Sequence, residues 1–186
     1  MNKIKNLILL AAIALFSNAS IAQTQKTVMV GGAAMYPTKN IIENAVNSKD
    51  HTTLVAAVKA AGLVETLMSA GPFTVFAPTN TAFNLLPAGT VANLLKPENK
   101  ATLAGILTYH VVAGKISSKE LIKMIKMGKG KASIKTVAGG TLIAMRKGNS
   151  ISLKDEGGKM AYVTIKDVNQ SNGVIHVIDH VLLPKM

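Results

Sequence analysis

The last fifteen residues place the strongest constraint on how this chain can fold. Asn172-Gly173 is a turn dipeptide, and the almost uninterrupted apolar run VIHVIDHVLLP follows it from Val174 to Pro184. The β-branched residues in this run favour a strand. Because polar residues do not alternate with apolar ones, the strand is predicted to be buried on both faces. This segment must therefore close a core that the preceding chain has already built.

The N-terminus has the pattern of a secretory signal peptide. Basic residues at Met1–Lys5 precede an apolar stretch at Leu7–Phe16, which is too short to span a bilayer. Ser20 and Ala22 then occupy the positions −3 and −1 of a cleavage site. We expect residues 1–22 to be removed after Ala22, leaving a secreted or periplasmic protein without a transmembrane segment. The alternative is an uncleaved membrane anchor, which the short apolar stretch disfavours.

Composition narrows the class of protein further. The chain of 186 residues contains no cysteine, which excludes disulfides, thiol nucleophiles and cysteine-based metal sites. Its formal net charge is +12, and such an excess either favours anionic partners or simply forms a solvated basic surface. Seven lysines fall in one stretch, Lys115, Lys119, Lys123, Lys126, Lys129, Lys131 and Lys135. There is no tryptophan, only three tyrosines and four phenylalanines, which argues against nucleic-acid binding by base stacking.

Periodicity predicts helices in the first part of the chain and strands in the last. Residues 23–38 lack a sustained pattern and are interpreted as a lead-in segment. Further along the chain, Thr52 or Thr53 is the predicted cap of an early helix. Ser117 and Glu120 form a capping box before a lysine-rich helix. Strands are predicted at 73–77, 109–112, 132–137, 141–147, 150–154 and 161–168. This order indicates an α+β protein, or a β-sandwich with helices packed on it.

Three segments together carry a family resemblance. They are TVFAPTNTAFNLLP at Thr74–Pro87, LTYHVVAGKI at Leu107–Ile116 and SNGVIHVIDHVLLP at Ser171–Pro184. Their order and spacing resemble the fasciclin domain, and the likeness covers about Asn40–Pro184. The resemblance implies a β-sandwich wedge with a layer of packed helices over residues 39–186. It also implies a single-domain secreted bacterial protein that acts in cell adhesion or extracellular binding.

The resemblance also suggests binding residues. Tyr109 and His110 match the family's Tyr-His pair, with apolar neighbours after them. In animal members, an Asp-Ile pair shortly before the last signature segment has been tied to integrin binding. The matching positions here are Asp167 and Val168, so the acid is kept and the isoleucine is replaced.

The histidines raise a metal hypothesis, which their spacing disfavours. His176 and His180 would share a face on a helix, but on a strand their backbones lie roughly 13 Å apart. We therefore expect His110, His176 and His180 to serve as hydrogen-bonded structural groups, with no metal and no cofactor. Asp179 is expected to tie the closing strand to a neighbouring backbone.

Other polar residues of the first signature segment are also interpreted as structural. Thr79 and Asn80 satisfy backbone groups at a turn from strand to helix, with Asn80 as the predicted cap. No nucleophile elbow, zinc-binding helix motif or phosphate loop occurs in the sequence. An enzyme is therefore not expected.

Three functions remain open on the sequence. The leading hypothesis is a secreted, non-catalytic binding module whose partner is an extracellular or cell-surface protein. The first alternative is an electrostatic binder of acidic glycan through the Lys115–Lys135 patch, with Lys119, Lys123 and Lys126 on one exposed stripe. The second alternative is an extracytoplasmic hydrolase or a metal-handling protein.

Overall fold

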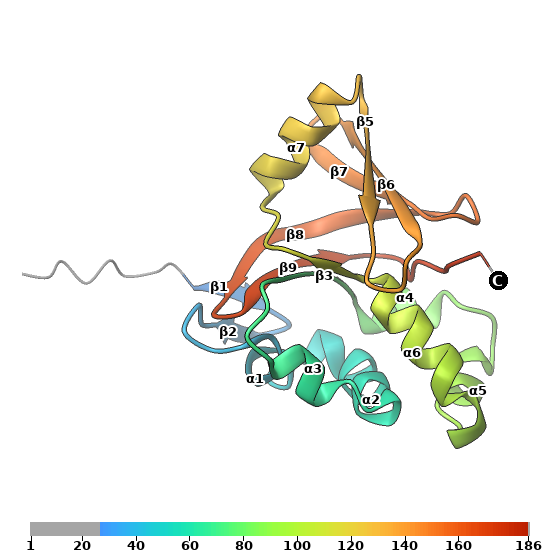
Figure 1. The fold of residues 1–186 in the computed structure, drawn as a ribbon. Helices are drawn as coiled ribbons and strands as arrows, with labels where there is room; N and C mark the ends of the chain where they lie inside the picture. The colour runs from blue at the N-terminus through green and yellow to red at the C-terminus, as the bar shows by residue number, and fades with distance from the viewer. Residues whose placement is uncertain (1–26, 186) are drawn as a thin grey trace, which may run out of the picture.

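A layer of short helices lies under a long, bent sheet in the computed structural model, which describes residues 27–185 (Figure 1). The α-helices are α1 Ile41–Ala45, α2 Thr52–Ala61, α3 Val64–Met68, α4 Asn80–Asn84, α5 Thr90–Leu94, α6 Lys100–Tyr109 and α7 Ser118–Met127. Two 3-10 turns, Lys49–His51 and Pro97–Asn99, precede α2 and α6. The strands are β1 Val28–Val30, β2 Ala33–Met35, β3 Phe73–Pro78, β4 Val111–Ala113, β5 Lys131–Lys135, β6 Thr141–Lys147, β7 Ser150–Lys154, β8 Met160–Gln170 and β9 Gly173–Ile178.

Seven of these strands form one sheet in the order β4-β3-β9-β8-β7-β6-β5. The pair β3–β9 is parallel and the other neighbours are antiparallel. Strand β8 changes partner along its length: Met160–Tyr162 pairs with β7, and Val163–Gln170 pairs with β9 through two irregularities. The sheet bends where β8 changes partner, and the predicted α+β wedge with packed helices is confirmed (Figure 1).

The central strands β3 and β9 separate two cores. Val75 and Ile175 face the helical layer and belong to the first core, together with residues of α2 and α6. Phe76 and Ile178 face the other way, into a second core closed by β5–β8 and α7. Every residue of β9 is buried, which confirms that the C-terminal strand is covered on both faces. The strand ends at Ile178, and His180 beyond it is exposed.

Helix α7 begins as the sequence predicts. The Ser117 hydroxyl accepts a hydrogen bond from the Glu120 N–H, and the Glu120 carboxylate accepts one from the Ser117 N–H at 2.6 Å. These reciprocal bonds satisfy two backbone donors at the helix end. Burial of Leu121 and Ile125 then fixes the helix against the second core.

The predicted cap of α4 is wrong by one residue. Thr79 is the N-cap, and its hydroxyl accepts a hydrogen bond from the Ala82 N–H. Asn80 instead reaches across to α2, where its Oδ1 accepts a hydrogen bond from the Thr53 N–H at 3.0 Å. No neighbouring side chain caps α2. The distant Asn80 instead satisfies a free backbone N–H in the first turn of this helix.

The strand predicted at 109–112 is also corrected. Tyr109 is the last residue of α6, His110 caps that helix, and β4 begins at Val111. The run YHVV suits the end of a helix as well as a strand, because all four residues are buried and a short buried run has no periodicity that separates the two.

The lead-in segment contains structure that its weak periodicity did not predict. Strands β1 and β2 form an antiparallel hairpin, and Val30 and Met35 bury themselves in the first core. The signal-peptide prediction for residues 1–22 lies outside the described residues. Over residues 27–185, no helix combines the length and apolar character needed to cross a bilayer.

Candidate functional site

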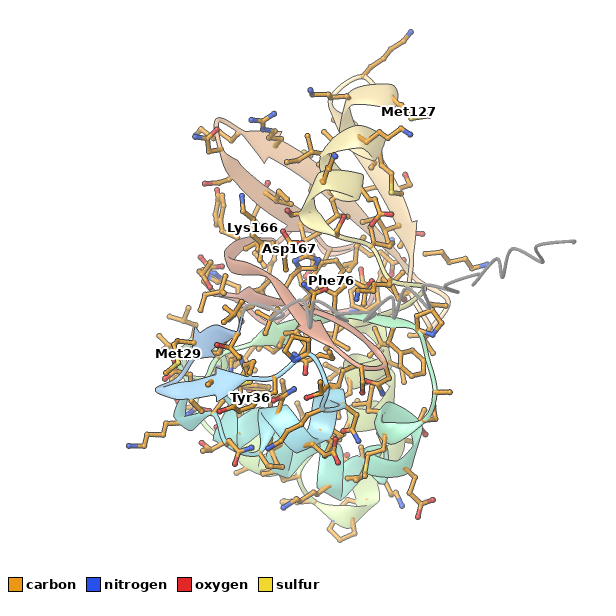
Figure 2. All side chains as sticks on the ribbon, turned by 90° about the vertical axis from the view of Figure 1, so that its left-hand side faces the viewer. Met29, Tyr36, Phe76, Met127, Lys166 and Asp167 are labelled. Atoms are coloured by element: carbon orange, nitrogen blue, oxygen red, sulfur yellow. The ribbon has the colours of Figure 1, made fainter. Side chains whose placement is uncertain are left out.

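Asp167 lies at the junction between the sheet and α7. Figure 2 shows it beside Lys166, midway between Met127 at the tip of α7 and the β1–β2 hairpin, where Met29 lies on β1 and Tyr36 directly follows β2. These three apolar side chains are all exposed, and Met127 is the most exposed of them at 74%. The same face of the molecule therefore presents separate apolar groups on both sides of the Asp167 carboxylate.

The Asp167 carboxylate is occupied by the start of α7. Its Oδ1 accepts a hydrogen bond from the Ser118 N–H at 2.7 Å, and its Oδ2 accepts one from the Ser118 hydroxyl. Asp167 holds a left-handed backbone conformation, with φ of 59°, in the irregular part of β8. An anion at a helix N-terminus satisfies free N–H groups and opposes the helix dipole. Asp167 thus fastens α7 to the central sheet.

His176 supports the same junction from β9. Its Nε2 lies 2.9 Å from the Ile116 carbonyl oxygen, and its Nδ1 accepts a hydrogen bond from the Asp167 N–H. This pattern requires a proton on Nε2 and none on Nδ1, so the ring is neutral. Burial lowers the pKa of His176, against smaller opposing contributions from the Ile116 backbone and Asp167. The ring also stacks on Phe76, with centroids 5.8 Å apart.

The Tyr-His pair at the end of α6 is buried, with Tyr109 against Thr141 and Glu156 and His110 against the closing segment of the chain. The Tyr109 hydroxyl donates to the Thr141 carbonyl oxygen at 3.0 Å and accepts from the Glu156 N–H. His110 Nδ1 lies 2.8 Å from the Ile106 carbonyl oxygen, and its Nε2 accepts from the Leu182 N–H at 3.0 Å. Burial lowers the pKa of His110 to about 4, so this imidazole is also neutral at pH 7. A partner could not touch either side chain without opening the fold.

The remaining predicted positions lie apart from one another. Val168 is 1% exposed and packs in the first core. Asp179 Oδ1 accepts a hydrogen bond from the Tyr162 N–H at 2.7 Å and lies 2.8 Å from His180 Nδ1. Within residues 27–185, no three histidine, aspartate or glutamate side chains lie close enough together to hold a metal ion.

The lysines of α7 lie on the opposite side of the helix from its buried residues. Lys119, Lys123 and Lys126 are all exposed, and they line a shallow surface depression together with Ser117, Glu120 and Ile122. Glu120 is the acidic member of this lining, and the Ser117 N–H that it accepts is the main cause of its lowered pKa. Its carboxylate is therefore already engaged by the helix end, while the three ammonium groups face solvent.

Sequence reasoning missed a second exposed surface, the outer face of strands β5–β8. Paired residues of an antiparallel sheet point to the same side. Register therefore places Met145, Ser152 and Tyr162 in one row, and Ile143 and Met160 in the next. Exposed Lys154 lies between Ile143 and Met160 in the second row, and three further exposed lysines lie around the rows, Lys131, Lys135 and Lys147.

The signal for this outer face was present in the predicted strand 141–147. Leu142 and Ala144 are fully buried under α7, while Ile143 and Met145 stay partly exposed on the other side. A strand that is apolar on both faces but covered by a helix on only one leaves an apolar surface. Only the pairing of β6, β7 and β8 shows that Tyr162 and Met160 share this surface with Ile143 and Met145.

Comparison with known proteins gives a consistent picture. The family model described as Fasciclin domain matches residues 49–184. Protein sll1483 of Synechocystis sp. is 46% identical over 172 residues, covering 90% of this chain and 86% of that protein. Immunogenic protein MPB70 of Mycobacterium bovis is 37% identical, covering 75% and 66%. Human periostin is 33% identical over 77% of this chain, which corresponds to only 16% of periostin.

A solved structure shares the fold. It is a FAS1 domain pair from the insect cell adhesion molecule fasciclin I, with a TM-score of 0.69 and 19% identity. The match covers 78% of this chain and 51% of that one. The wedge-shaped sheet, its helical layer and the match of the family model over most of the chain together show that this protein belongs to the fasciclin domain family.

Proposed function

We propose that this protein is an extracellular, non-catalytic binding module that mediates adhesion by surface contact. One observation carries the proposal: Asp167 and the buried histidines of the signature segments are committed to the fold. Asp167, His176 and His110 each have their hydrogen-bonding atoms occupied by backbone or by Ser118. Exposed lysines and apolar side chains remain free at the surface, and these suit binding better than catalysis.

Two surfaces are available for such contact. The outer face of β5–β8 combines Tyr162, Met145 and Ile143 with exposed lysines. Aromatic, methionine and aliphatic side chains at the centre of a surface are typical of protein docking sites. We assign this face to an extracellular protein partner, and Tyr162, which is 40% exposed, to its centre.

A second candidate function is the binding of acidic polysaccharide through α7. The surface depression lined by Lys119, Lys123 and Lys126 favours it, because neighbouring cations on one helix face act together on a polyanion. Such binding weakens steeply as salt screens the charges, whereas docking on an apolar surface does not.

One experiment separates the two candidates. Purified protein is measured against immobilised matrix proteins and against heparin and alginate, across a salt gradient. The variants are Tyr162→Ala on the sheet face and the triple change Lys119→Gln, Lys123→Gln and Lys126→Gln on α7. If α7 carries glycan binding, the triple variant elutes from heparin at clearly lower salt, while Tyr162→Ala elutes with the parent.

The melting temperature of the triple variant serves as its control. Exposed charges on a helix matter by only tenths of a kcal/mol, so it should melt close to the parent. Equal retention of parent and triple variant on both polyanions would eliminate the electrostatic candidate. Failure of every matrix protein and glycan to bind the parent would count against adhesion as a whole.

We also propose that the protein leaves the cytoplasm and that its mature form begins at Gln23. The basic start, the short apolar stretch and the small residues Ser20 and Ala22 support this. Intact-mass measurement of the exported protein tests the site directly. Recovery of residues 1–22 on membrane-bound protein would instead favour an anchor.

A further inference from the structure

The positive charge of this protein is concentrated on one half of the molecule. Residues 121–154, which run from α7 to the end of β7, contain no acidic residue. They contain eight basic ones, Lys123, Lys126, Lys129, Lys131, Lys135, Arg146, Lys147 and Lys154. The rest of the described chain carries nine acidic and ten basic residues, so its charges nearly cancel. A field of one sign therefore surrounds the half built by α7 and β5–β7.

Two turns lie together at the far end of this basic half. The first joins α7 to β5, and Figure 1 shows it at the end of the wedge farthest from the helical layer. The second joins β6 to β7. Lys131 pairs with Met145 across β5 and β6, so Lys147 lies roughly 7 Å beyond the level of Lys131, toward the same end. We call this end the tip, and its exposed side chains are Met127, Lys129, Lys131, Arg146 and Lys147.

The cations of the tip have no counter-charge within the described chain. Over residues 27–185, the one ion pair joins Asp179 to His180 and involves none of them. Arg146 donates to the Gly148 carbonyl oxygen at 2.7 Å, and this neutral acceptor leaves the guanidinium charge in place. Glu120 is in the first turn of α7, about 10 Å along the helix axis from its last residue. The tip therefore presents four uncompensated positive charges.

An apolar side chain stands among these cations. Met127 is 74% exposed, more than any other large apolar residue of the described chain. Figure 2 shows it at the end of the molecule opposite the helical layer. Gly128 and Gly130 follow it without side chains, so this turn can approach a surface closely. A flexible apolar side chain that projects into water would gain free energy by entering an apolar phase.

We propose that the tip docks end-on onto the anionic surface of a lipid bilayer, with Met127 in the interfacial region and the cations against lipid phosphates. Each basic residue strengthens binding to an anionic bilayer by about fivefold, and a buried apolar side chain adds to this. A soluble polyanion matches the charges but offers no apolar phase for Met127. The docking is additional to the proposed adhesive contact and rests only on the proposed export, which brings the protein to a membrane surface.

Sedimentation with vesicles tests the docking. The exported protein is mixed with vesicles of phosphatidylcholine alone or with about 30% phosphatidylglycerol, at about 0.1 M salt. It should bind only the anionic vesicles. The triple change Lys129→Gln, Lys131→Gln and Lys147→Gln should weaken this binding by at least about 30-fold. Failure of the parent to bind anionic vesicles, or equal binding by the triple variant, would overturn the proposal.

A matched triple variant separates the tip from the overall charge. Lys59→Gln, Lys96→Gln and Lys100→Gln remove the same charge from exposed positions of the helical layer. This control should lose less than about threefold in vesicle binding, because charges more than a Debye length from the surface are screened. Both triple variants should melt close to the parent, since all six lysines are exposed. Equal losses in the two variants would assign the binding to net charge and contradict a docking tip.

Met127 separates a bilayer from a soluble polyanion. Met127→Gln keeps the charge and length of the side chain, so heparin should release it at the same salt concentration as the parent. Its binding to anionic vesicles should fall by about three- to tenfold, because a polar amide gains nothing in the interfacial region. Tyr162→Ala, on the outer sheet face, should bind vesicles like the parent. Unchanged vesicle binding of Met127→Gln would overturn the insertion of this side chain.

A fluorescent reporter detects the tip in the bilayer directly. The chain contains no tryptophan, so Met127→Trp carries a single indole, whose emission should shift to the blue on anionic vesicles. The control Met68→Trp changes a methionine of α3 that is 45% exposed in the helical layer, and its emission should stay in place. A shift in the control alone would put another face on the membrane and contradict the proposal. A parent that binds vesicles but no matrix protein would defeat the adhesion proposal alone, so the two proposals fail separately.

Discussion

At the scale of single residues, the signature segments owe their polar character to the demands of burial. His110 and His176 each join two backbone groups, and each does so as a neutral ring with a lowered pKa. Tyr109 is fully buried and bridges Thr141 and Glu156 through its hydroxyl. These side chains form hydrogen bonds within the fold, and that role follows from their buried positions.

Stability should fall as the pH drops from about 6.5 to about 4. The pKa of His110 is about 4 in the fold against an ordinary value of 6.5, so the unfolded chain binds more protons in this window. The contribution is fully present above pH 6.5 and is lost below pH 4, a difference of roughly 3 kcal/mol. His176 acts in the same direction.

Denaturant unfolding at several pH values measures this effect. The variant His110→Gln cannot titrate and should show a flatter dependence on pH from a lower starting stability. His110→Ala should cost roughly 1–3 kcal/mol at neutral pH, because the Leu182 N–H loses its acceptor. Parallel pH profiles for the parent and His110→Gln would show that another group controls the acid response.

Gly140 leaves room for the ring of Tyr109. A Cβ at this position would lie 2.7 Å from Tyr109 Cε2, in a buried place where the ring cannot move aside. Gly140→Ala should therefore destabilise the fold by about 1–3 kcal/mol. The matched control is Gly105→Ala in α6, where no atom lies within 4 Å and alanine should stabilise by about 0.5–1 kcal/mol. Melting curves of the two variants should move in opposite directions.

At the scale of elements, α7 depends on a partner far away in the sequence. Its own capping box secures Ser117 and Glu120, but the N–H of Ser118 goes to Asp167 on β8. Leu121 and Ile125 then seal the second core. The position of the lysine stripe on the surface is therefore set by the sheet as well as by the helix.

Asp167→Ala should loosen α7 while the rest of the fold stays intact. Ser118 then loses two acceptors, and the expected loss is about 1–3 kcal/mol. Hydrogen exchange should accelerate most in the first turn of α7. Asp167→Asn keeps one oxygen acceptor and tolerates the left-handed backbone, so it should fall between alanine and the parent. Unchanged exchange in Asp167→Ala would show that the capping box suffices alone.

At the scale of the whole molecule, Asn172 connects the helical layer to the sheet. Its Oδ1 accepts a hydrogen bond from the Ile41 N–H at 3.0 Å, and its Nδ2 donates to the carbonyl oxygens of Leu67 and Ser69 at 2.8 Å each. One side chain in the turn before β9 therefore fixes both the start of α1 and the end of α3. The side chain is buried, and its amide has no equivalent among apolar residues.

Asn172→Ala should be among the most destabilising single changes where the helical layer meets the sheet. Three backbone groups lose their partner at once, and the expected cost is about 2–4 kcal/mol, limited by entry of water. Chemical denaturation gives the free energy of unfolding. The neighbouring Ser171→Ala is the control, since Ser171 is exposed. A comparable loss in both variants would assign the effect to the turn and not to the amide.

Much of the fold could be predicted because its signals are local. The capping box at Ser117 and the alternation in β5 and β6 each depend on residues a few positions apart. The apolar run of β9 is equally local and correctly predicted a strand covered on both faces. Predictions failed where two local outcomes were nearly equal, as at Tyr109 and His110, where a helix end and a strand start compete for the same apolar residues.

The roles of the polar residues were decided by tertiary structure. Nothing near Asp167 in the sequence shows that its carboxylate accepts a hydrogen bond from Ser118. Nothing near Asn80 shows that it accepts one from the Thr53 N–H. The outer face around Tyr162 likewise exists only once the strands have paired. The sequence by itself determined most of the helices and strands and which residues seek burial, since periodicity and apolar character are properties of the local chain. Only the folded structure decided which backbone groups each buried polar atom would satisfy, because hydrogen-bond partners are chosen by proximity in space.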